Sequence, residues 1–263
     1  MRPKFPKLRL KTKNATPSYF TRNVVQTTSF DENELEKTWQ EIFAQKQKSH
    51  RFLDVVLPDA WVRHFLVQTP VNANSLADIQ AAACKRFETL YGEDADTWCI
   101  MLDVQNLIGD GVKNVVCAVP KNILAALEKN ARRYRQHFLS IQSNFVKTWN
   151  THRHLLLKNS WFLVPSADVL LLVIIDKGTW QFVRQVEIRP GSSTNDAWLQ
   201  TCVSREALML GVPQPVSLQL ASLVPDTFPM AWKKHGVDRN GVISVPMNIA
   251  ALSSQNTLLK AAV

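Results

Sequence analysis

The spacing of hydrophobic and polar positions along the chain predicts an alternating series of strands and helices. Apolar stretches of strand length occur at 52–57, 61–67, 97–104, 113–119, 138–141, 161–164, 169–175, 180–188, 216–220 and 242–245. Apolar residues at helical spacing predict helices over about 29–48, 75–90, 120–135, 144–157 and 196–210. Residues 7–13 and 19–27 have the pattern of short edge strands, and 248–262 that of a last helix or a loose tail.

Local signals mark the ends of several of these elements. Ser75 and Asp78 have capping-box spacing before the second helix, and Gly211 follows the helix at 196–210 as a carboxyl-terminal cap. Residues 176–179 spell Asp-Lys-Gly-Thr, which looks like a phosphate-binding loop. Because they lie between two consecutive strands, we interpret them as a hairpin turn with Gly178 at positive φ.

The order of elements suggests two related halves, each with strands followed by a helix, a strand and a helix. We therefore predict a mixed α/β fold with two lobes. The first lobe spans 1–159 and contains a small α+β insertion at about 72–120, and the second, truncated or degenerate, spans 160–263. Duplicated units of this kind resemble the RNase H-like lobes of the actin-like ATPase architecture, although such a likeness alone says little about function.

Several stretches between residues 50 and 221 carry a more specific resemblance. They are 55–57, 62–67, 86–87, 90–98, 117–120 (Cys-Ala-Val-Pro), 140–143, 149–150, 178–184 and 205–211 (Arg-Glu-Ala-Leu-Met-Leu-Gly). Together they resemble bacterial PilM-like proteins and the cytoplasmic domain of the secretion protein GspL. This resemblance implies a cytoplasmic protein held at the inner membrane by a partner. The implied partner is the short tail of a bitopic PilN-like or GspM-like protein in a type IV pilus or type II secretion platform.

The glycine-rich turns that hold ATP in such families have no counterpart here. Residues 4–25 contain neither Asp nor Gly, the strand at 161–164 continues into Pro-Ser-Ala-Asp, and the strand at 216–220 continues into Ala-Ser-Leu. Without glycine the backbone cannot closely approach a phosphate. We therefore expect a protein that is not an enzyme, with no cofactor and no catalytic residues. A residual ATP-binding actin-like protein is the alternative.

Composition narrows the class of protein. The chain has 263 residues, 46% of them hydrophobic and 20% charged, so it is neither disordered nor fibrous. Its longest apolar run, 169–175, is too short to span a membrane, and the basic and apolar alternation of 1–13 does not resemble a secretory signal. Four cysteines without close pairs and six scattered histidines predict neither disulfides nor a metal site. We expect a cytoplasmic protein.

The net charge of +9 is concentrated in two zones. Residues 1–22 carry seven cations and no acid, and 121–158 carry eight cations and one acid, so each zone has a charge of +7. The rest of the chain therefore has a charge of 9 − 14 = −5. A solvated basic face is the simplest explanation, and an acidic protein, an anionic membrane surface or nucleic acid are the alternative partners. The absence of arginines interleaved with aromatic residues, of a zinc module and of a helix-turn-helix pattern makes nucleic acid the least favoured of the three.

The candidate partner-binding residues are Trp61, Arg63, Arg132, Arg133 and Arg135. We expect them near a groove between the first subdomain and its insertion, where the arginines would pair with acidic peptide residues or lipid head groups. Two simpler interpretations stay open. Trp61 also fits core packing, and the three later arginines suit the carboxyl end of a helix, where cations interact favourably with the dipole.

Overall fold

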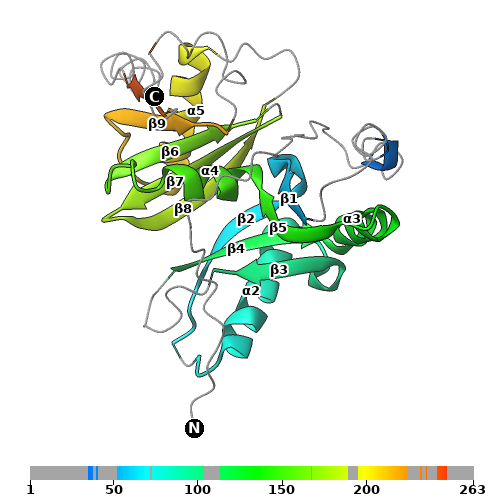
Figure 1. Ribbon diagram of the computed structural model, residues 1–263. Helices are drawn as coiled ribbons and strands as arrows, with labels where there is room; N and C mark the ends of the chain where they lie inside the picture. Colours follow the sequence, from blue (N-terminus) through cyan, green and yellow to red (C-terminus); the bar gives the residue numbers. More distant parts are fainter. Residues whose placement is uncertain are drawn as a thin grey trace.

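A computed structural model describes residues 35–37, 40, 52–71, 73–103, 113–166, 168–188, 195–223, 232, 235 and 242–247. Their strands form sheets with the orders β10-β9-β6-β7-β8, β2-β4-β3 and β1-β5 (Figure 1). The strands are β1 (Phe52–Leu57), β2 (Arg63–Gln68), β3 (Trp98–Leu102), β4 (Lys113–Pro120), β5 (His137–Ser143), β6 (Ser160–Pro165), β7 (Val169–Asp176), β8 (Thr179–Glu187), β9 (Ser217–Ala221) and β10 (Val242–Pro246). The helices are α2 (Leu76–Tyr91), α3 (Lys121–Arg133), α4 (Asn144–His152) and α5 (Asp196–Leu210), with 3-10 turns η1 (Asp59–Trp61) and η2 (Ala95–Thr97).

The five-stranded sheet has the strand order of an RNase H-like lobe. Strands β6, β7 and β8 form an antiparallel meander, and α5 then leads to β9, which runs parallel to β6. The last strand departs from that architecture, because β10 pairs antiparallel with β9. The mixed α/β fold predicted from the sequence is confirmed.

The core of this lobe lies on both faces of β7, whose residues 169–175 are all buried. Helix α5 covers one face through Leu199 and Val203, both fully buried. Phe145 and Trp149 of α4 cover the other, with the Trp149 and Trp180 rings packed edge to face at 4.7 Å. The continuously apolar run in the sequence therefore corresponds to a strand covered on both sides.

The three-stranded sheet packs against α2, whose fully buried Phe87 contacts Trp98 and Tyr91. The predicted pairing of 97–104 with 113–119 is confirmed by the antiparallel β3 and β4. The predicted capping box of Ser75 and Asp78 is also confirmed. Strand β2 belongs to this sheet because it pairs antiparallel with β4, so the unit that contains the predicted insertion at 72–120 also includes residues 63–68.

The two-stranded sheet pairs β1 and β5 in parallel and packs against α3. Two predicted boundaries differ from the structure. The strand expected at 61–67 starts at Arg63, because residues 59–61 form the turn η1, and the helix expected at 144–157 ends at His152. Leu155 and Leu156, beyond that end, pack against the core formed by β6, β7 and Phe145. Predictions for 7–13, 19–27, most of 29–48 and 248–262 lie outside the described residues.

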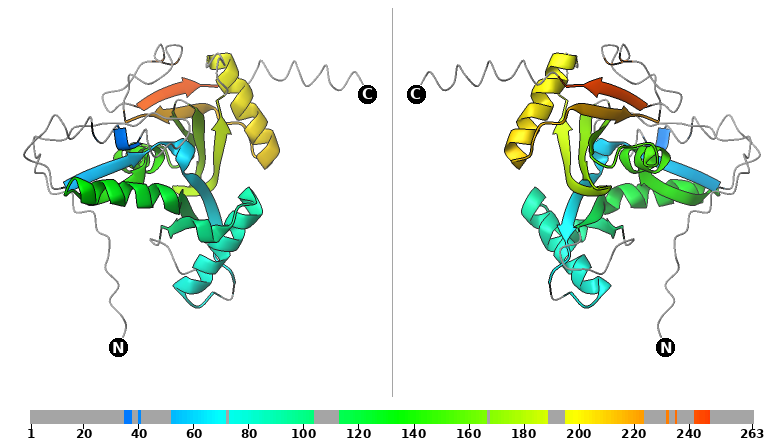
Figure 2. Two further views of the ribbon diagram at one scale, coloured as in Figure 1. Left: turned by 90° about the vertical axis from the view of Figure 1, so that its right-hand side faces the viewer. Right: turned by 90° about the vertical axis from the view of Figure 1, so that its left-hand side faces the viewer.

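Strands β2 and β8 meet at the edges of their sheets and join the two parts of the molecule (Figure 2). The Gln185 Nε2 atom donates to the Asp59 carbonyl oxygen at 3.3 Å. At the other end of the contact, Lys113 Nζ donates to the Gln181 carbonyl oxygen at 3.0 Å. We call this line of contact the seam.

Candidate functional site

An open hollow of about 430 Å³ lies where β4 leaves its sheet and α3 begins. Its lining residues are Glu93, Thr97, Trp98, Pro120, Lys121 and Asn122. Trp98, the first residue of β3, pairs with Pro120, the last residue of β4, so the sheet ends at the hollow. Pro120 is also the N-cap of α3 and makes no side-chain capping bond. The hollow therefore lies between the three-stranded unit and the helix that packs on the β1-β5 sheet.

The rim of the hollow is held in place by hydrogen bonds between side chains and backbone groups. Gly92, at φ 67°, ends α2 in the left-handed conformation, and η2 follows. Asp94 caps η2 by accepting a bond from the Asp96 amide at 2.9 Å. On the opposite side, Lys121 Nζ donates to the Asp96 carbonyl oxygen at 2.7 Å. The first turn of α3 is thereby tied to the turn that precedes β3.

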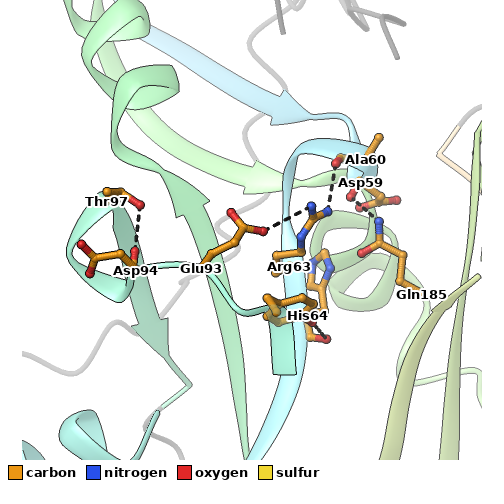
Figure 3. Close-up of polar contacts among 9 residues, drawn as sticks. Asp59, Ala60, Arg63, His64, Glu93, Asp94, Thr97 and Gln185 are labelled. Carbon is orange, nitrogen blue, oxygen red and sulfur yellow. Dashed lines mark hydrogen bonds and ion pairs between the residues drawn. The ribbon is translucent and has the colours of Figure 1, made fainter. Parts of the chain in front are cut away.

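Arg63 of β2 points toward Glu93, a lining residue of the hollow (Figure 3). Its guanidinium carbon is 5.6 Å from the centre of the Tyr91 ring and 5.7 Å from that of Trp98. It also forms a 3.8 Å ion pair with Glu93. Arg63 therefore lies next to two lining residues of the hollow, Glu93 and Trp98, and its role in partner binding stays a prediction.

The other four predicted residues lie elsewhere. Trp61 is 6% exposed and packs in the core beneath α3, so it follows the core-packing interpretation rather than facing a partner. Arg132 pairs with Glu128 at 3.4 Å, Arg133 pairs with Glu36, and Arg135 is exposed at φ 53°. These arginines are at the far end of α3, about 17 Å along the helix from its first residue. The structure does not bring them together with Arg63 in one groove.

Sequence reasoning missed a buried carboxyl group, Asp59, at the seam. Its side chain is fully buried and accepts bonds from the Phe145 amide at 2.8 Å and from Asn144 Nδ2 at 2.9 Å, so it caps the amino end of α4. Burial raises its pKa to about 7, although the bonds from Asn144 and Phe145 act in the opposite direction. An aspartate after a proline is typical of an exposed turn, so nothing local in the sequence indicated this burial.

His64 is a second buried ionisable group, on the opposite face of β2 from Arg63. It is 2% exposed, its Nε2 atom is 2.8 Å from Ser143 Oγ, and its ring packs edge to face against Phe145. Burial lowers its pKa to about 3. Because Asp59 and His64 are both closed to solvent, they act as structural groups of the seam and not as part of the open hollow.

Other chemistry predicted from the sequence can be located as well. Lys177 and Gly178 have φ of 51° and 79°, which confirms a hairpin turn with two residues in the left-handed region.

Burial raises the pKa of the Cys117 thiol to about 12 and that of Cys202 to about 11. Among the described residues, no cluster of His, Cys, Asp and Glu has the arrangement of a metal site. Within the same residues, no helix has the length and apolar character needed to cross a membrane.

The fold defines a mixed α/β protein with one RNase H-like sheet, an α+β unit and an open hollow between that unit and α3. No family model and no curated protein matches the sequence. Solved structures with a similar fold include the PilM-PilN type IV pilus biogenesis complex, with 14% identity, 66% of this chain and 52% of that chain covered and a TM-score of 0.47. Another is the cytoplasmic domain of EpsL, an inner-membrane component of the type II secretion system of Vibrio cholerae, with 12% identity, coverage of 64% and 60%, and a TM-score of 0.43.

A third similar structure is a Bacteroides thetaiotaomicron protein of unknown function with an actin-like ATPase fold. It has 8% identity, coverage of 68% of this chain and 64% of that chain, and a TM-score of 0.45. This chain thus spans between 52% and 64% of the length of the three structures.

Proposed function

We propose that this chain is a non-catalytic cytoplasmic scaffold that binds the tail of a bitopic, PilN-like or GspM-like membrane protein in a type IV pilus or type II secretion platform. The observation that carries this proposal is the open hollow at the start of α3. Its apolar Pro120 is flanked by an acid and a base, Glu93 and Lys121, and the core residue Trp98, 9% exposed, forms the floor. A surface of this composition suits a peptide with apolar and charged side chains.

Strand β3 extends the surface on which such a tail would lie. Within the described residues, β3 stands at the edge of its sheet, and Met101 on it is 44% exposed. An extended peptide that enters the hollow at Trp98 would continue along β3 by adding a strand to the sheet. Backbone hydrogen bonds would then supply affinity, and the hollow would supply specificity for one side chain. The kind of partner follows from the family resemblance of the sequence stretches.

The basic carboxyl end of α3 suits a position close to the inner membrane. Arg132 is 83% exposed, and Lys129 and Arg135 are exposed beside it, with Glu128 as the nearby acid. Bound to a membrane protein, the chain would present these cations toward anionic head groups. Each such contact contributes weakly, so the tail and not the membrane would determine the location.

The test measures binding of fluorescent tail peptides from PilN-like and GspM-like proteins of the source organism by anisotropy. Asn122→Arg places a long cation in the hollow, and Asn150→Arg, on the exposed surface of α4, is its matched control. We expect a tail to bind the unaltered protein, the hollow variant to bind it roughly tenfold more weakly, and the control to be unchanged. Equal affinities for the two variants, or no binding of any tail, would refute the proposal.

A second measurement separates this proposal from a residual ATP-binding protein. A ligand that binds the folded state raises the melting temperature in proportion to the logarithm of its concentration. We expect millimolar MgATP to leave the melting temperature unchanged. A rise that depends on ATP concentration would favour the nucleotide-binding alternative.

A further inference from the structure

Two arginines from different sheets emerge on one side of the seam. On β2, Arg63 and Phe65 lie on the face that packs against α2, since alternate residues of a strand share a face and Phe65 contacts Phe87. On β8, Arg184 and Val186 lie on the face covered by α5. Helices α2 and α5 are on the same side of the molecule, and one end of α5 is directed toward α2 (Figure 2).

Ion pairs leave an excess of positive charge at this place. The buried Glu206 of α5, 3% exposed, is shared by Arg184 Nε and Arg205 Nη2, each at 3.2 Å. One carboxylate therefore serves two guanidinium groups, whose side chains are 45% and 58% exposed. Arg63 adds a third guanidinium, whose partner Glu93 is 3.8 Å away, at a distance typical of a weak ion pair.

Tyr91, the last residue of α2, connects the two groups of arginines. Its hydroxyl donates to the His64 carbonyl oxygen at 3.4 Å, next to Arg63 on β2. Burial raises the pKa of Tyr91, and the charges of Arg63, Arg184 and Arg86 act against that rise. Arginines from β2, β8 and α2 therefore influence the same phenol. With Arg205, four cations face two acids, Glu93 and Glu206.

Exposed apolar side chains accompany the arginines on both helices. Leu90 of α2 is 42% exposed and lies one turn after Arg86. Leu208 and Met209 of α5 are 84% and 55% exposed and lie one turn after Arg205. Each helix thus presents a cation followed by an apolar group.

We propose that this surface is a second docking site, for an acidic amphipathic segment of a protein partner. We name it the arginine seam, and its residues are Arg63, Arg86, Leu90, Arg184, Arg205, Leu208 and Met209. Charge complementarity selects the occupant, because carboxylates at the spacing of a helix or strand can reach guanidinium groups on four different elements. The apolar groups favour a peptide over a phosphate ligand, which would leave them exposed.

The two sites adjoin at Arg63, which pairs with Glu93 of the hollow. The other residues of the arginine seam lie on α2, α5 and β8, and the variants used below leave Arg63 unchanged. These variants should therefore leave tail binding at the hollow intact, and Asn122→Arg should leave the arginine seam intact. The proposal and the scaffold function above can thus fail independently.

The test uses a fluorescein-labelled synthetic helical peptide with leucines along one face and glutamates elsewhere, and a comparator with lysine in place of glutamate. Binding is followed by anisotropy at low and moderate salt. The double variant Arg86→Ser/Arg205→Ser removes two exposed cations from the arginine seam. Its matched control, Lys85→Ser/Lys158→Ser, removes two exposed cations outside it, with the same change in net charge.

We expect the protein to bind the acidic peptide and not the lysine peptide, with affinity that falls as salt rises. The arginine double variant should bind roughly tenfold more weakly, and the lysine double variant should match the unaltered protein. A second variant, Leu208→Ser/Met209→Ser, should weaken binding and leave the salt dependence unchanged.

Three results would overturn the proposal. The first is an equal loss in the two double variants, which would show a response to net charge alone. The second is a failure of the acidic peptide to bind the correctly folded protein. The third is tighter binding of tripolyphosphate or duplex DNA than of the peptide, abolished by Arg86→Ser/Arg205→Ser, which would assign the surface to phosphate groups.

Discussion

Replacement of Asp59 by asparagine tests the account of the buried seam. Asparagine has nearly the same shape and can still accept the bond from the Phe145 amide, and its neighbour Asn144 can turn its amide to match. The substitution therefore keeps the cap of α4 and removes only the ionisation. Any effect that depends on pH must then come from the charge of Asp59.

The sign and size of the effect follow from the two pKa values. The carboxyl group titrates near its ordinary value of 3.8 in the unfolded chain and near about 7 in the fold. Between these values the unfolded state releases a proton that the folded state keeps, so the free energy of unfolding falls as pH rises. The slope is about 1.4 kcal/mol for each pH unit, and the total is about 4 kcal/mol. Asp59→Asn has no carboxyl group to titrate here. Its free energy of unfolding, relative to that of the unaltered protein, should therefore rise by about 4 kcal/mol between pH 4 and pH 8.

His64 produces the opposite slope over nearly the same range. Its pKa is lowered from 6.5 to about 3, so below pH 6.5 the unfolded state binds a proton that the folded state rejects. The free energy of unfolding therefore rises with pH between about 3 and 6.5. The two slopes largely cancel in the unaltered protein from about pH 4 to 6.5. Asp59→Asn should reveal the His64 slope and lose stability on acidification, and His64→Gln should reveal the Asp59 slope.

Urea denaturation followed by tryptophan fluorescence measures these free energies at a series of pH values. The informative quantity is the difference between each variant and the unaltered protein, because other titrating groups cancel in it. The Asp59→Asn difference should grow steadily from pH 4 to pH 7 and level off above pH 7. A difference that is constant with pH would show that Asp59 is ionised in the fold and would refute the reasoning.

Three further substitutions test the packing and turns of the fold by urea denaturation. Phe87→Ala removes a fully buried ring between α2 and the three-stranded sheet and should cost about 3–5 kcal/mol, whereas a cost below about 1 kcal/mol would contradict its burial. Gly178→Ala places a Cβ where no atom lies within 4 Å, so its cost of about 1–2 kcal/mol should come from the left-handed backbone alone and be equal at low and high salt. Ser75→Ala removes the bond to the Asp78 amide and should cost about 1 kcal/mol, which Ser75→Thr should largely restore.

Local patterns were sufficient to predict most elements of the fold. The apolar run at 169–175 is a strand buried on both faces, and Gly211, at φ 65°, ends α5 as its position predicted. The capping box at Ser75 and the hairpin turn at Gly178 also agree with the sequence. These features depend on residues a few positions apart, so their physical cause is contained in the sequence pattern.

Pairings between distant residues were not predictable in this way. Asp59, which follows Pro58, is fully buried because Asn144 and Phe145, 85 and 86 positions further along the chain, donate hydrogen bonds to its carboxyl group. Trp61 is also buried by residues far along the chain, because the turn η1 directs its ring into the core that α3 covers. Arg132, Arg133 and Arg135 are close together in the sequence, but they lie at the far end of α3 and not beside Arg63.

The arginine seam depends both on local sequence patterns and on a contact between residues that are distant in the sequence. A period of two places Arg63 with Phe65 and Arg184 with Val186, and a helical period places Leu90 with Arg86 and Met209 with Arg205, all of which the sequence contains. What it does not contain is that β2 and β8 meet edge to edge, with Gln185 bonded to the Asp59 backbone. Once that contact is known, four faces that separately look like ordinary amphipathic surfaces become one cationic and apolar surface. A surface built from separate elements is therefore recognised by which edges meet. Charge reversal on one edge should weaken binding of the acidic peptide without unfolding the protein.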